Sequence, residues 1–172
     1  LVGSEMCIRD SNKIDIRLSE LGGKGLFSKN IENELLNKNI DLAVHALKDL
    51  PSFDTEGLVT NCFLKRNNSN EVMISNSNKK LNDLVPGSIV GTSSFRREFQ
   101  LKRIRKDLNF KLIRGNVDTR IRKLKNGEYD AIILAKAGLS SLNLDNEITQ
   151  EFSNNELIPV SYTHLTLPTT SK

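Results

Sequence analysis

Short apolar runs alternate with segments of helical periodicity along most of the chain. The runs are rich in leucine, isoleucine and valine, which predicts strands buried inside a sheet. They span residues 42–44, 58–64, 72–74, 88–91, 110–114 and 131–135. Segments 29–38, 95–106 and 119–125 carry apolar residues three and four positions apart, which predicts helices. The alternation of the two patterns indicates an α/β fold.

Polar residues suited to helix capping stand at the start of each helical segment. Ser28 precedes the first, Thr92–Ser94 precede the second, and Asn116 or Asp118 can cap the third. The first two helices are expected to bury one apolar side each. The residues expected there are Ile31, Leu35, Leu36, Leu101, Ile104 and Leu108.

Ionisable residues follow the apolar run at 42–44. His45, Lys48 and Asp49 stand where that strand should end, and Pro51 prevents a helix from continuing. Ligands of open α/β sheets bind beyond the carboxyl ends of the strands. A carboxylate beside an ammonium there suits a substrate whose charge changes during reaction. Taken alone, the same residues are better explained by an ion pair on a surface loop, and His45 is expected to be structural.

Composition places the chain among soluble globular proteins. Hydrophobic residues make up 37% of the 172 residues and charged residues 27%. No apolar run approaches the length of a membrane-spanning helix. The two cysteines, Cys7 and Cys62, do not form a disulfide framework, which favours a reducing compartment such as the cytoplasm.

Positive charge is concentrated in one block. Residues 96–125 contain twelve basic and three acidic residues, whereas the whole chain has a net charge of +4. Arg96 and Arg97 fall in the first turn of a predicted helix, where the helix dipole disfavours cations. An anion bound between them would explain this placement.

The block is consistent with either a nucleic acid or a small polycarboxylate as partner. Aromatic residues make up only 5% of the chain and tryptophan is absent, so platforms for base stacking are scarce. A nucleic-acid-binding module and a non-catalytic solute-binding domain both remain as alternatives to an enzyme.

Five segments together resemble the porphobilinogen deaminase (hydroxymethylbilane synthase) family. They occur in that family's order and at its spacing, and the resemblance covers roughly residues 12–160. The segments are Gly22–Phe27, His45–Pro51, Gly91–Arg97, Arg114–Arg120 and Glu128–Ala135.

The resemblance implies a transferase of tetrapyrrole and heme biosynthesis. Such an enzyme joins four porphobilinogen units head to tail, releases ammonia at each step and yields the linear tetrapyrrole hydroxymethylbilane. A covalently bound dipyrromethane cofactor carries the growing chain. Porphobilinogen is then the partner, with no role for a metal, a nucleic acid or a membrane, and a monomer is expected.

The implied fold is α/β, with two periplasmic-binding-protein-like lobes around a cleft. The first lobe is expected to be incomplete, and a C-terminal third domain, which holds the cofactor cysteine in the family, is expected to be missing. The polypeptide is therefore expected to be inactive. The expected divisions are a non-native segment at 1–11, a partial first lobe at 12–66, a hinge connector at 67–70, the second lobe at 71–156, a return toward the first lobe at 157–160 and a non-native tail at 161–172.

By this resemblance, Asp49 is the catalytic carboxylate. It would stabilise cationic intermediates and help to move protons to the leaving amine and from the new ring junction. Phe27 would border the reacting ring. The residues implied to bind carboxylates of cofactor and substrate carry cationic or hydrogen-bonding groups. They are Lys24, Lys48, Thr92, Ser93, Ser94, Arg96, Arg97, Arg114, Gly115 and Arg120.

A few positions depart from the family pattern. Ala46 stands where serine is common, so one hydrogen bond is expected to be lost. Ser140 or Ser141 stands where a basic residue is common, so one carboxylate anchor is expected to be lost. Neither Cys7 nor Cys62 matches the cofactor cysteine.

Overall fold

The computed structural model of the protein describes residues 28–47, 50 and 54–160. The chain divides into two compact units. Unit 1 includes residues 66–159, and unit 2 includes residues 18–65 together with the last residues of the chain. No helix in the described part of the chain is long and apolar enough to cross a membrane.

Unit 1 is built on a five-stranded sheet with strand order β3-β2-β4-β1-β5. Strand β2 runs parallel to β3 and β4, whereas β1 runs antiparallel to β4 and β5. The sheet is therefore mixed rather than purely parallel. The strands are β1 (Glu71–Ser75), β2 (Ile89–Gly91), β3 (Asn109–Lys111), β4 (Ala131–Ala135) and β5 (Gln150–Glu151).

The predicted strands at 72–74, 88–91 and 131–135 are confirmed. The strand predicted at 110–114 ends early, at Lys111, because Leu112 leaves the ladder and its carbonyl accepts a hydrogen bond of 2.8 Å from the Tyr129 hydroxyl. Strand β5 was not predicted, since its two residues are polar and show no apolar alternation.

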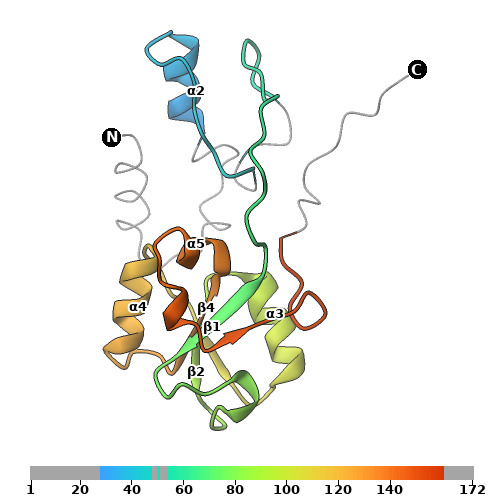
Figure 1. Ribbon diagram of the computed structural model, residues 1–172, viewed down its shortest axis with the longest axis vertical. Helices are drawn as coiled ribbons and strands as arrows, with labels where there is room; N and C mark the ends of the chain where they lie inside the picture. The colour runs from blue at the N-terminus through green and yellow to red at the C-terminus, as the bar shows by residue number, and fades with distance from the viewer. Residues whose placement is uncertain (1–27, 48–49, 51–53, 161–172) are drawn as a thin grey trace, which may run out of the picture. The chain divides into compact units, whose positions relative to one another are not determined.

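Helices cover both faces of this sheet (Figure 1). Helix α3 (Phe95–Ile104) places Leu101 in a core with Met73 and Ile133. Helices α4 (Val117–Lys125) and α5 (Lys136–Ser140) pack against the opposite face. Successive strand residues point to opposite faces, so β1 and β4 are buried on both sides. This double burial explains their continuous apolar runs.

Helix α3 is shorter than its sequence pattern predicted. It ends at Ile104, because Arg105 has φ −131° and ψ 89°, outside the helical region. The periodicity that placed Ile104 and Leu108 on one face therefore breaks between them. Leu108 lies in the loop after α3 and is buried, whereas Ile104 is 46% exposed. The predicted place of Ile104 in the core was therefore wrong.

Unit 2 contains helix α2 (Lys29–Leu36), which confirms the first predicted helix. Ser28 occupies its N-cap position and is buried, but its side chain makes no capping hydrogen bond. Ile31 and Leu35 are half-buried. Leu36 is 45% exposed, so its predicted burial was wrong. Its side chain lies beside Gly57, where an added Cβ would be 3.1 Å from the Leu36 Cδ2.

The strands predicted in unit 2 at 42–44 and 58–64 are absent from the structure. Leu42 is 72% exposed and Leu64 is 82% exposed, as expected for apolar residues that have no sheet to join. A strand needs a hydrogen-bonded neighbour, and the described residues of unit 2 include none. Apolar character alone was therefore a misleading signal here.

Arg105 joins the end of α3 to the short helix η3 (Leu81–Asp83). Its Nη1 donates to the carbonyls of Leu81 at 2.6 Å and Asn82 at 3.0 Å, and its Nη2 donates to that of Leu84 at 2.8 Å. The same guanidinium forms two hydrogen bonds with Asp107 and holds the pKa of that carboxyl below its usual value. Arg105 is thus a structural member of the basic block.

Replacing Arg105 with alanine should lower the free energy of unfolding by about 1–2 kcal/mol, because three carbonyls lose a charged donor. Urea unfolding followed by circular dichroism measures this, with exposed Arg103 as the matched control on the same helix. The Asp107 contribution should be present above the usual aspartate pKa and fade as the pH falls through the lowered one. An R105A curve that coincides with that of R103A would contradict the assignment.

Candidate functional site

The predicted site residues of unit 1 gather at one edge of the sheet. Thr92–Arg97 directly follow β2, and Arg114–Arg120 follow β3. These two strands are parallel neighbours, so their carboxyl ends point the same way. Helices α3 and α4 begin at this edge, and their unpaired N–H groups and positive dipole ends favour an anion there.

The hydroxyl residues after β2 shape the start of α3. Thr92 is fully buried, and its Oγ1 accepts a hydrogen bond of 3.2 Å from the Ser94 backbone N–H. Ser94 is the N-cap, and its Oγ accepts from the Arg97 backbone N–H at 3.5 Å. Ser93 is half-buried between them. Because a hydroxyl both accepts and donates, Thr92 and Ser94 keep their O–H groups as donors.

The carboxylate of Glu71 lies between the two arginines that open α3. Arg96 Nη2 donates to Glu71 Oε1, and Arg97 Nη2 lies 2.6 Å from Oε2. The second contact is an ion pair and not an aligned hydrogen bond. Glu71 opens β1 and is only 2% exposed. The anion expected between these arginines is therefore supplied, in this structure, by the chain itself.

Backbone carbonyls hold the other ends of both guanidiniums. Arg97 Nη1 donates to the Ile133 carbonyl at 3.2 Å, and Arg96 Nη1 donates to the Ile158 carbonyl. The Nε–H of Arg97 is buried and meets no acceptor among the described residues. Gln100 adds to this corner, since its side chain accepts a 2.9 Å hydrogen bond from the Ile158 N–H.

Sequence reasoning missed Glu71. The signal that could have found it is a carboxylate at the head of the otherwise apolar strand Glu71–Ser75. A charged group inside a buried strand needs a partner of opposite charge, and the basic block offered several.

The second half of the edge is the turn between β3 and α4. Asn116 is the N-cap, and its Oδ1 accepts from the Thr119 N–H at 2.9 Å, which decides between the two predicted caps. Gly115 has φ +108°, and a Cβ there would lie 2.6 Å from Thr119 Cγ2. Arg120 Nε donates to the Gly115 carbonyl at 2.7 Å. Arg114 is 5% exposed, so both arginines are held within the turn region.

Other members of the basic block are engaged in ion pairs. Lys102 lies 2.8 Å from Glu98, one helical turn away, and 5.7 Å from the centre of the Phe110 ring. Lys125 lies 2.7 Å from Glu147. Glu98 and Asp107, the partners of Lys102 and Arg105, are already among the three acidic residues of the block, so of these contacts only the one with Glu147 offsets its excess positive charge further.

Four predicted site residues lie outside the described residues. They are Lys24, Phe27, Lys48 and Asp49. His45, three positions before Lys48 in the sequence, is among the described residues and is half-buried. Its Nε2 meets no hydrogen-bond partner among them.

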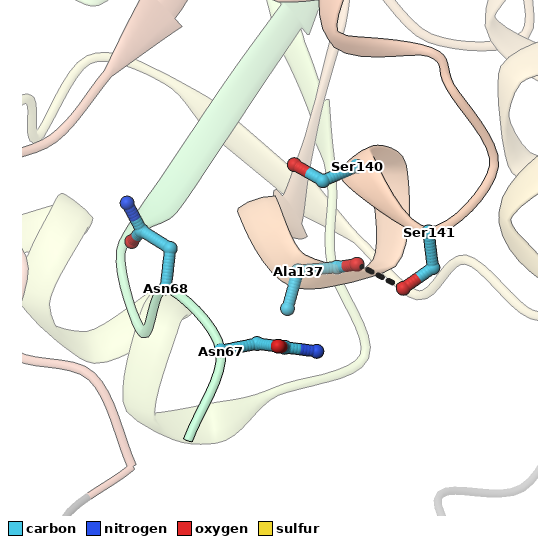
Figure 2. A pocket seen from close by; sticks show the side chains of 5 residues that line it. All are labelled: Asn67, Asn68, Ala137, Ser140 and Ser141. Atoms are coloured by element: carbon cyan, nitrogen blue, oxygen red, sulfur yellow. Dashed lines mark hydrogen bonds between the residues drawn. The ribbon is translucent and has the colours of Figure 1, made fainter. Parts of the chain in front are cut away.

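A pocket of about 270 Å³ lies beside α5 in unit 1 (Figure 2). It is lined by Ala137, Ser140 and Ser141 and by Asn67 and Asn68, which precede β1. Figure 2 shows the Ser141 hydroxyl turned back to the Ala137 carbonyl, to which it donates at 2.8 Å. The Ser140 hydroxyl donates to Asp145 at 2.6 Å. None of these five side chains is cationic.

Cationic and hydroxyl groups at the carboxyl ends of parallel strands are typical of α/β domains that bind anionic ligands. Comparison with known families specifies that class. Residues 9–163 match the family model described as porphobilinogen deaminase, dipyromethane cofactor binding domain. The chain belongs to the porphobilinogen deaminase family.

Curated relatives agree with the family model. The porphobilinogen deaminase of Bacillus pumilus is 50% identical over 152 residues, which cover 88% of this chain and 49% of the relative. Those of Geobacillus kaustophilus and Bacillus thuringiensis are 47% and 52% identical and cover 86% and 80% of this chain. The matched residues make up 48% and 45% of these two relatives, so the chain spans about half the length of the relatives it matches. These matches give no support to a nucleic-acid-binding module or a non-catalytic binding domain.

Replacing Gly115 with alanine should destabilise unit 1 by about 3 kcal/mol, because a side chain is strained at φ +108° and also collides with Thr119. Gly127 is the matched control: its φ is +79°, but nothing lies within 4 Å of an added Cβ. G127A should cost only about 1 kcal/mol. Urea unfolding measures both, and equal costs would argue against the close approach at Thr119.

Proposed function

We propose that this chain supplies the cofactor- and substrate-binding part of a porphobilinogen deaminase. The whole protein would join four porphobilinogen units, release ammonia at each step and form hydroxymethylbilane. One observation carries the proposal: within a chain of this family, two parallel neighbouring strands bring Thr92–Arg97 and Arg114–Arg120 to a single sheet edge.

The arginines at this edge suit a ligand with several carboxylates. Porphobilinogen carries an acetate and a propionate, and each joined unit adds another pair. A guanidinium binds a carboxylate in a two-pronged way that an ammonium cannot. Arg96, Arg97, Arg114 and Arg120 are proposed to bind these groups.

Uncharged donors and further cations complete the proposed binding set. The Thr92, Ser93 and Ser94 hydroxyls are proposed as donors; those of Thr92 and Ser94 also accept within the turn, and Thr92 is fully buried. The backbone of Gly115 would add a hydrogen bond. Lys24 and Lys48 are proposed to add positive charge, and Phe27 is proposed to border the reacting pyrrole ring.

Asp49 is proposed as the catalytic carboxylate. Loss of ammonia leaves positive charge on the pyrrole being joined, and a fixed carboxylate lowers the energy of such a cation. The same group can take a proton from the new ring junction and deliver one to the leaving amine. These steps need no metal.

The donor set also fits a dipyrromethane cofactor, whose acetate and propionate groups match those of the substrate. When bound, this group supplies the anchored pyrrole to which new units are added. The protein's part is to hold its carboxylates with the arginines and hydroxyls of the sheet edge. Cys62 is free and exposed, and it is not proposed to hold the cofactor.

The division into units supports a further proposal about architecture. Units 1 and 2 would correspond to the second lobe and a partial first lobe of a periplasmic-binding-protein-like fold, with the division between residues 65 and 66 lying just before the expected hinge at 67–70. A soluble, cytoplasmic monomer is proposed, as befits an enzyme that handles small polar metabolites.

The substitution D49N tests the catalytic assignment in the protein extended to the length of its relatives. It should lower kcat about a hundredfold or more, because the amide cannot stabilise positive charge or accept a proton. KM should change far less, since the binding arginines are intact. Ammonia release from porphobilinogen measures the rate.

Exposed Asp41 provides the matched control for this experiment, since it opens the same stretch of sequence and has no proposed role. D41N should leave kcat unchanged. Turnover by D49N at the rate of D41N would remove Asp49 from the mechanism.

Competition experiments test which anion the sheet edge prefers. Porphobilinogen binding to the 172-residue chain, followed by calorimetry, should weaken in the presence of millimolar tricarballylate, a small polycarboxylate. Duplex DNA at moderate salt should not compete, because binding to nucleic acid falls steeply with ionic strength. Displacement by DNA but not by tricarballylate would contradict a carboxylate site.

A further inference from the structure

We propose that Glu71 is a positioning residue that presets the Arg96 and Arg97 guanidiniums to receive a ligand carboxylate. The inference rests on the proposed function, because it assumes that these arginines bind carboxylates of porphobilinogen or the cofactor. It adds a residue that the sequence motifs do not include.

Strand pairing fixes the place of Glu71. In the β1–β4 ladder Glu71 pairs with Ala135, the last residue of β4. Because β1 is antiparallel to β4, its first residue lies at the edge where β4 ends and where α3 begins. Glu71 shares a strand face with Met73, which packs in the core beneath α3. The side chain therefore points to the arginines and not to the helices of the other face.

The burial of Glu71 makes this contact obligatory. The side chain is 3% exposed, and a carboxylate removed from water is stable only when it is paired and hydrogen-bonded. The two guanidiniums supply that pairing, one at each carboxylate oxygen. Since Glu71 is part of the buried strand, the guanidiniums take their orientation from it, and not the reverse.

The arrangement leaves room for a ligand at Arg96. Its side chain is 27% exposed, against 13% for that of Arg97. Each terminal guanidinium nitrogen carries two N–H groups, and the contacts with Glu71 and Ile158 use one at each. The second N–H of each can meet a carboxylate that arrives from solvent.

Charge balance sets what the cluster can accept. Two guanidiniums and one carboxylate carry a net charge of +1, which one ligand carboxylate neutralises. Without Glu71 the two cations would repel each other and move apart. Holding them in place before binding removes the entropic cost of ordering them afterwards.

The test compares porphobilinogen binding, by calorimetry, among variants of the 172-residue chain. E71Q keeps the shape but loses the charge, and it should weaken binding about tenfold, because the arginines are no longer held. E71D keeps the carboxylate and should recover most of the affinity. E151Q is the matched control: Glu151 also lies on the sheet and pairs with a cation, Lys136, but it does not contact the arginines. It should leave affinity unchanged.

These variants distinguish failure of the proposed function from failure of the positioning role of Glu71. If the unaltered chain does not bind porphobilinogen, the proposed function fails at this edge. If it binds and E71Q binds equally well, or if E71D is as weak as E71Q, the positioning role of Glu71 is refuted while the carboxylate site stands.

A measurement on the unaltered, ligand-free chain covers the case in which E71Q does not fold. Nitrogen-15 NMR reports rotation of the arginine guanidinium groups. Arg96 and Arg97 should show slow rotation, unlike exposed Arg103. Rotation of all three at the same fast rate would overturn the proposal.

Discussion

The pairing of β4 with its two neighbours is the constraint on which the rest of unit 1 depends. Strand β4 is parallel to β2 and antiparallel to β1. The parallel pair directs the turn before α3 to one edge, and the antiparallel pair brings Glu71 to the same edge. A slip of one residue in β1 would turn Glu71 toward the opposite face. Register therefore determines whether the buried carboxylate finds its arginines.

Members of the basic block differ in how their charges are paired. Arg105 ties α3 to η3 through three carbonyls, and Lys102 and Lys125 neutralise nearby carboxylates. Arg96 and Arg97 are also paired, but their partner is buried while Arg96 is partly open to solvent. Net charge counted along the sequence cannot separate these roles, because each depends on what the chain brings within a few ångströms.

The sequence predicted the fold of unit 1 well where pattern and pairing agree. Val72–Ile74 and Ala131–Leu134 are buried on both faces, so continuous apolar runs identified them. The same kind of run failed at 42–44 and 58–64, because strand formation depends on a neighbour that no local pattern reveals. The sequence motifs identified the residues that follow β2 and β3 at the sheet edge. Glu71 was missed because its partners, Arg96 and Arg97, lie 25 and 26 positions away in the sequence.

A buried ion pair is a weak source of stability, because desolvation offsets most of its attraction. A hydrophobic residue at the head of β1 would pack at least as well against Met73 and Leu101 of the same core. What a hydrophobic residue cannot do is hold two guanidiniums close together against their mutual repulsion. The arrangement at Glu71 is thus better explained by the geometry it imposes on Arg96 and Arg97 than by its contribution to folding, so the register of the sheet fixes the geometry of the two arginines that we propose as carboxylate ligands.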